Sequence, residues 1–235
     1  MISSDKPIIY LPHNIKNGNI KFIKDFFDEI KANYRFKNFD KVVISSENFF
    51  VFTDNVSCID KRLLSEDIIG NIRKLKTTLP DDFKIKIVAY IRRQDLAIEA
   101  KFNQRVKTRN TFLYSISEFT KNILENCGLD YDFILGLWAS EFGAENIVLR
   151  IYEKAQLPDG TVVDFLKNVL QIKDEDSIRK INSSFTFDNP RLSRDMLEYK
   201  SIFNKIYKDD LSSQGQFYID FNKVNDEIEK DERYN

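Results

Sequence analysis

The chain has 235 residues, of which 42% are hydrophobic and 13% aromatic, and its formal net charge is -1. That length and composition predict one domain with a sizeable core, and the balanced charge argues against broad nucleic-acid binding. The sequence contains neither an apolar run of about 20 residues nor a signal-peptide pattern, so we expect no transmembrane segment and a cytoplasmic location.

Metal and triad chemistry also have little support. The sequence has one histidine, and its two cysteines, Cys58 and Cys127, stand far from any metal-like spacing. A zinc site and a Ser-His-Asp triad both need histidines or clustered cysteines, so we expect no metal cofactor.

Apolar and polar residues alternate in a way that predicts an α/β fold. In chain order, the expected strands lie near 7–10, 41–46, 84–91 and 146–151, and the expected helices near 19–33, 64–78, 94–107, 116–126 and 131–142. This alternation favours a mainly parallel sheet with helices on both faces. After residue 157 the pattern is helical only, near 161–171, 193–207 and 221–231. We therefore expect a single domain over 1–235, with an α/β core at 1–157 and a helical C-terminal extension at 158–235.

Local sequence signals define the ends of two of these helices. Ser115 and Glu118 fit a capping box, and Gly143 fits a C-terminal stop. Trp138 stands at helical spacing from Ile134, which predicts a core residue in preference to a sugar-stacking platform.

Glu47 directly follows the expected strand at 41–46. Alternation places it on the same face as Val43 and Ser45, at the carboxyl end where open α/β sheets bind ligands. Glu47 is therefore a candidate for chemistry, with a strand-end cap or a salt-bridge partner as the alternatives.

The segment 84–107 predicts a buried strand that runs directly into a helix. Arg92 and Arg93 follow the apolar run, and their side chains should point to opposite faces. From 92 to 109 there are six basic and two acidic residues, a local balance of +4. This pattern suits an anion, and a solvated basic helix face is the alternative.

Four segments carry a resemblance to a known family. They are Ile91-Arg-Arg-Gln-Asp95 with Ala100-Lys-Phe-Asn-Gln104, Val42-Val-Ile-Ser-Ser-Glu-Asn-Phe-Phe50, Tyr131-Asp-Phe-Ile-Leu-Gly-Leu-Trp-Ala-Ser-Glu-Phe-Gly143, and Asn146-Ile-Val-Leu-Arg-Ile-Tyr-Glu153. In their order and spacing they resemble segments of sulfotransferases, especially a bacterial group thought to act on glycans. The similarity covers most of residues 40–185.

The resemblance implies a P-loop-NTPase-like three-layer fold and a nucleotide co-substrate, 3'-phosphoadenosine 5'-phosphosulfate. The family holds the donor's 3'-phosphate with an arginine and a serine eight residues later. These positions fall on Arg92 and Ala100, and Arg93 would border the same site. Ala100 lacks the hydroxyl that the family's serine provides.

The resemblance also implies roles on the acceptor side. Glu47 would be the catalytic base that takes the proton of an acceptor hydroxyl on a glycan or polysaccharide. His13 and Arg105 are the expected acceptor-binding residues, with an ordinary surface-turn histidine as the alternative for His13. Arg150, at the end of the last expected strand, would be structural.

One family feature is missing from the printed sequence. Sulfotransferases cradle the 5'-phosphosulfate in a Lys-Thr-Gly-Thr-Thr type of loop, and none of the seven glycines here stands in such a motif. The chain is then either part of a longer protein or a domain with half of its donor site. An active sulfotransferase and an inactive nucleotide- or glycan-binding module both remain. A phosphoryl-transfer enzyme is disfavoured, because it would need a Gly-Lys-Ser/Thr loop.

Overall fold

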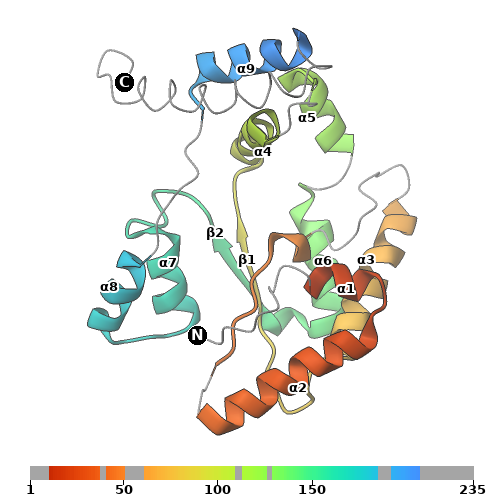
Figure 1. Cartoon of the computed structure of the whole chain (residues 1–235), viewed down its shortest axis with the longest axis vertical. Helices are drawn as coiled ribbons and strands as arrows, with labels where there is room; N and C mark the ends of the chain where they lie inside the picture. The colour runs from red at the N-terminus through yellow and green to blue at the C-terminus, as the bar shows by residue number, and fades with distance from the viewer. Residues whose placement is uncertain are drawn as a thin grey trace. The chain divides into compact units, whose positions relative to one another are not determined.

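The computed structural model describes residues 11–37, 41–50, 61–108, 113–125, 129–184 and 192–206. Within these ranges the chain is mixed α/β and mostly helical, with a small parallel sheet (Figure 1). The chain divides into two compact units, Met1–Ile91 with Glu125–Ile178, and Arg92–Leu124 with Arg179–Asn235. The first unit thus includes part of the expected C-terminal extension, up to residue 178.

Strands β1 (Ile87–Ile91) and β2 (Ile147–Ile151) form the described sheet. They pair in parallel, with Ile87 opposite Ile147 and Ile91 opposite Ile151. Both lie inside segments expected to be strands. Ala89 of β1 is buried, whereas Leu149 and Ile151 of β2 are exposed. The connection from β1 to β2 is helical and includes α6 (Tyr131–Phe142), as a parallel crossover usually does.

The expectation of a strand at 41–46 is wrong. These residues carry no strand in the structure, and a 3-10 turn, η2 (Glu47–Phe49), follows them. Val42 and Val43 are exposed. A β-rich sequence becomes a strand only where a neighbouring strand accepts its hydrogen bonds. The expected strand at 7–10 and helix at 221–231 lie outside the described residues.

Most expected helices are present with small shifts at their ends. They are α2 (Ile20–Lys37), α3 (Lys61–Lys76), α4 (Gln94–Thr108), α5 (Ile116–Glu125), α6, and α9 (Arg194–Ile206). The segment expected at 161–171 forms α7 (Gly160–Asp164) and a π-helical turn, η4 (Phe165–Val169). Besides η2, the described residues contain three short elements that were not expected: α1 (Leu11–Lys16), α8 (Glu175–Ser183) and the turn η3 (Ala144–Asn146).

The capping signals are confirmed. The backbone N–H of Ser115 donates to the Glu118 carboxylate at 2.7 Å, and the N–H of Glu118 donates to the Ser115 hydroxyl oxygen at 3.2 Å. Gly143 ends α6 with φ +87°, a conformation that favours glycine, and its N–H donates to the carbonyl of Ala139.

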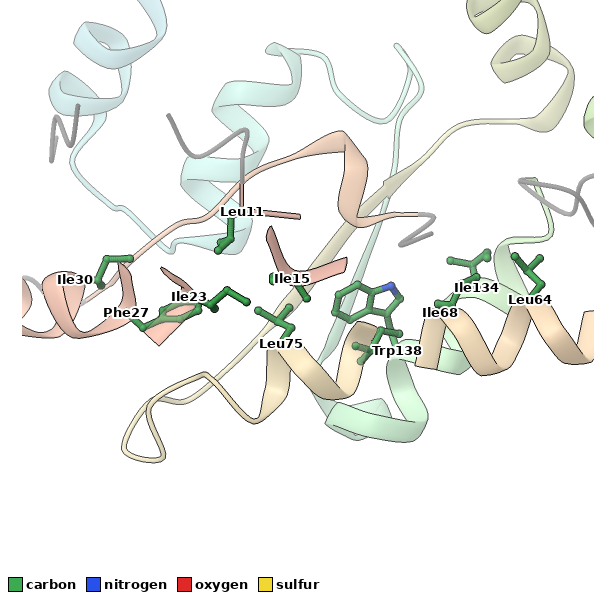
Figure 2. Packing of buried hydrophobic residues seen from close by; sticks show 11 residues of the cluster. Leu11, Ile15, Ile23, Phe27, Ile30, Leu64, Ile68, Leu75, Ile134 and Trp138 are labelled. Atoms are coloured by element: carbon green, nitrogen blue, oxygen red, sulfur yellow. The ribbon is translucent and has the colours of Figure 1, made fainter. Parts of the chain in front are cut away.

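The main core of the first unit joins α1, α2, α3 and α6. Its buried side chains extend in a row from α2 past Trp138 to α3 and α6 (Figure 2). Trp138 is 4% exposed and stacks on Phe142 at 5.9 Å between ring centroids. The prediction that Trp138 is a core residue is confirmed. Partly buried Phe49 and Phe50 pack against this core, so the short turn that contains Glu47 is anchored to it.

Candidate functional site

The junction between β1 and α4 presents two arginines in different states. β1 ends at Ile91 and α4 begins at Gln94, so Arg92 and Arg93 lie directly between them. Arg92 is half-buried, with its Nε atom covered. Arg93 is exposed and donates two hydrogen bonds to the Asp95 carboxylate, both at 2.7 Å. Arg92 is therefore the more buried of the two arginines.

The Arg93 pair belongs to the start of α4. The hydrogen bonds from Arg93 lower the pKa of Asp95 to about 2, and the backbone N–H of Leu96 adds to this effect. Asp95 lies in the first turn of the helix, where a carboxylate is favoured by the exposed N–H groups. Arg93 therefore binds the Asp95 carboxylate at the start of α4. It also lies at a position where the resemblance implies donor binding.

The remaining candidates of the second unit lie along α4. Lys101 and Arg105 are exposed and one helical turn apart, and Ala100 is half-buried. Asn103, on the buried side, donates to the carbonyl of Leu192 at 3.0 Å and accepts from its N–H at 3.3 Å. These two bonds fix the rotation of α4 about its axis, because only one side of the helix can reach Leu192. The basic side chains Lys101 and Arg105 remain exposed.

Glu47 lies in the first unit, on the 3-10 turn. It is exposed, and Phe49 and Phe50 hold the turn against the core, where Phe50 makes an edge contact with Tyr131 at 5.8 Å. The Ser46 hydroxyl oxygen caps the turn by accepting from the N–H of Asn48 at 3.3 Å. The structure thus presents the Glu47 carboxylate on an anchored turn, where the sequence predicted a strand end.

His13 also lies in the first unit. It is exposed on α1, and its Nε2 atom is 2.9 Å from the side-chain amide nitrogen of Asn17, one turn later. His13 and Glu47 belong to the first unit, whereas Arg92, Arg93, Ala100 and Arg105 belong to the second. The candidate residues are therefore divided between the two units.

A polar network that the sequence did not predict joins the sheet to α7 and η4, around the buried carboxylate of Asp164. The hydroxyl of Tyr90 on β1 donates to Oδ2 of Asp164 at 2.6 Å. Arg150 on β2, directly opposite Tyr90, donates from Nε to the same oxygen at 3.0 Å and from Nη2 to Oδ1. Asn168 donates to Oδ1 at 2.7 Å. We call these four residues the Asp164 network.

Burial and charge act in opposite directions in this network. Burial by itself would raise the pKa of Asp164, but the hydrogen bonds from Arg150, Tyr90 and Asn168 together bring it below its ordinary value. Burial and the bond to Asp164 raise the pKa of Tyr90, so this phenol stays protonated and donates. Arg150, expected to be structural, pairs with Asp164 and so connects β2 to α7.

Metal ligands do not cluster in the part of the chain that the structure describes, where no group of three or more His, Cys, Asp or Glu side chains could hold an ion. Over the same residues, no helix combines the length and the apolar character needed to cross a membrane.

Comparison with known proteins identifies a similarity over part of the chain. The chain is 37% identical over 86 residues to an uncharacterized protein of Archaeoglobus fulgidus; the match covers 35% of this chain and 21% of that protein. The chain thus spans about a fifth of that relative's length. No family model and no solved structure matches the chain.

Proposed function

We propose that this chain is a sulfotransferase-like domain with a P-loop-NTPase-like three-layer fold. In this proposal it transfers a sulfuryl group from 3'-phosphoadenosine 5'-phosphosulfate to a hydroxyl of a glycan or polysaccharide. The observation that carries the proposal is the junction of β1 and α4, where a short parallel strand runs through two arginines into a 15-residue helix.

The junction has the chemistry that a nucleotide phosphate needs. A guanidinium binds phosphate through charge-assisted hydrogen bonds, and the first N–H groups of a helix favour an anion. Arg92 is half-buried, and a partly buried guanidinium binds an anion more strongly than a fully hydrated one does. Arg93 is paired with Asp95, and we assign the 3'-phosphate to Arg92, the position that the resemblance implies.

The acceptor side of the proposal rests on Glu47. A base near the acceptor hydroxyl takes its proton as the oxygen attacks sulfur. Glu47 is exposed and its turn is anchored by aromatic side chains, so its carboxylate is accessible to an acceptor. His13 and Arg105, both exposed, are assigned to acceptor binding.

Ala100 favours a second candidate, an inactive module that binds nucleotide or glycan. The family's serine hydroxyl is missing at this half-buried position of α4, which removes one phosphate contact. The absence of a Lys-Thr-Gly-Thr-Thr type of loop from the printed sequence favours the same candidate.

Calorimetry with adenosine 3',5'-bisphosphate tests the nucleotide site. Arg92→Ala should weaken binding by about 1.5–3 kcal/mol, roughly 10- to 150-fold, because it removes a charge-assisted contact. Lys101→Ala is the matched control, since it removes the same charge from an exposed position of α4. Its effect should stay within about threefold.

Three results separate the candidates. Absence of binding by the parent, or equal losses in Arg92→Ala and Lys101→Ala, would remove the nucleotide site. Binding together with transfer of labelled sulfate to any member of a glycan panel supports the enzyme. Binding without transfer across the panel supports the binding module.

A further inference from the structure

Residues 41–46, which we call the open segment, have a strand sequence without a strand neighbour. Val42, Val43 and Ile44 are β-branched, a type of residue that is enriched in strands. The chain makes no helix, turn or bend over this segment, and Ser46 has the extended backbone angles φ -159° and ψ 134° (Figure 1). In the part of the chain that the structure describes, no strand pairs with it.

The backbone of the open segment is available for pairing. Among the described residues, no backbone–backbone hydrogen bond reaches the N–H or C=O groups of residues 42–45. Unpaired groups of this kind along an extended chain are a template for a further strand. Another extended chain supplies alternating donors and acceptors at the same spacing. The partner that the open segment fits is therefore a second strand.

The side chains show how the open segment is held. Val42 and Val43 point to opposite faces of an extended chain, and they are 38% and 45% exposed. Ile44 is partly buried and packs against the main core of the first unit, as do Phe49 and Phe50 just after the segment. The segment is thus anchored at the surface in the form that a second strand would bind, which lowers the entropic cost of association.

The charges at the two ends of the segment match those of a second copy. Lys41 stands at its start and Glu47 directly follows its end, and both are exposed. In an antiparallel pair with Ile44 opposite Ile44 of the second copy, Lys41 lies opposite Glu47 of the second copy. Two-fold symmetry repeats this pair, and opposite charges directly across from each other stabilise paired strands.

We propose that two copies of this chain associate through antiparallel pairing of residues 41–47. Two short strands make a small interface, so we expect a weak dimer with a dissociation constant on the order of 100 µM. The pairing does not rest on the proposed function. If Glu47 is the base of that reaction, the monomer is the form that offers it to an acceptor.

Sedimentation equilibrium of the full chain, from about 10 µM to 1 mM, tests the association. Lys41→Glu should weaken it by about 5- to 30-fold, because a glutamate then faces Glu47 of the second copy. Adding Glu47→Lys to the same chain should restore it. Lys173→Glu is the matched control, since it makes the same charge change at an exposed position of the first unit.

Proline variants test the backbone pairing separately from the charges. Adjacent N–H groups of a strand point to opposite edges, so only one of Val42→Pro and Val43→Pro removes a hydrogen bond between the copies. That variant should weaken the dimer by at least about 10-fold, and the other should change it by less than about threefold. Unchanged hydrogen-exchange protection of β1 would show that both variants fold.

Three results would overturn the proposal. The first is a monomer at every concentration. The second is a dimer whose dissociation constant is the same in Lys41→Glu and in both proline variants, since the copies would then meet through another surface. The third is hydrogen-exchange protection of residues 42–45 in the dilute monomer, which would assign the pairing of the open segment to its own chain.

Discussion

Replacing Asp164 by asparagine should destabilise the first unit, because the carboxylate is surrounded by donors. It is 7% exposed and accepts from Tyr90, Arg150 and Asn168. An asparagine would direct its own N–H₂ group toward these donors and would leave Arg150 without its negative partner.

The magnitude follows from the partners. A net hydrogen bond to a charged group contributes about 1.5–3 kcal/mol, and loss of a buried ionic partner costs about 3–5 kcal/mol. The Arg150 side chain is 32% exposed, so water compensates part of this loss. We therefore expect Asp164→Asn to lower the free energy of unfolding by about 2–4 kcal/mol. In a chain of this size that corresponds to a melting temperature lower by roughly 4–16 °C.

Thermal and urea denaturation measure this loss, and Asp159→Asn is the matched control. Asp159 is an exposed carboxylate at the start of the same helix, and its side chain makes no capping hydrogen bond. The control should unfold within about 0.5 kcal/mol of the parent. A melting temperature of Asp164→Asn equal to that of Asp159→Asn would show that the Asp164 network contributes nothing to stability.

The pH dependence provides a second check. The pKa of Asp164 in the folded protein is below its ordinary value of 3.8. Its contribution is therefore fully present above pH 3.8, and it is lost as the pH falls through the folded pKa. The difference between the parent and Asp164→Asn should be large near neutral pH and should shrink in strong acid. A difference that does not change with pH would contradict the role of the charge.

Four further changes test other parts of the structure. Ala100→Ser should tighten binding of adenosine 3',5'-bisphosphate by about 0.5–1.5 kcal/mol in calorimetry, and unchanged affinity would place the 3'-phosphate elsewhere. Glu47→Gln should lower sulfate transfer by about 10²–10⁴-fold with little change in nucleotide affinity, and turnover within a few-fold of the parent would exclude Glu47 as the base. Burial lowers the pKa of Lys200 to about 8. The free energy of unfolding of the parent should therefore rise as the pH increases from 8 to the ordinary lysine pKa of 10.5. In urea denaturation, Lys200→Met should be more stable than the parent near pH 7 and should lack this rise. Ser115→Ala should cost about 1 kcal/mol, because it removes the hydroxyl that caps α5, and no change in unfolding would mean that the capping box with Glu118 is not needed.

The local parts of this fold were predictable because their causes lie within a few residues of each other. Helical spacing located α2 through α6 and α9, and the Ser115–Glu118 capping box and Gly143 marked ends that the structure confirms. Helix α8 was missed because its sequence is mostly polar. This helix buries one side chain, Ile178. The Asp174 carboxylate just before it accepts a hydrogen bond from the N–H of Asp176.

The candidate site was predictable only as positions along the chain. The junction at Arg92 was read from an apolar run followed by basic residues, and the structure places it between β1 and α4 as expected. The pairing of Arg93 with Asp95 depends on rotamers, which the residue order does not reveal.

What the sequence determined by itself, then, is most of the longer helices that the structure describes, together with strands β1 and β2. Tertiary structure alone decided that β1 and β2 pair with each other while the valine-rich segment at 41–46 remains outside the sheet. It also brought Asp164 to Tyr90, 74 residues away, and to Arg150, 14 residues away. The physical reason is that a helix forms its hydrogen bonds within one segment, whereas strand pairing and buried ion pairs depend on groups that only the folded chain brings together.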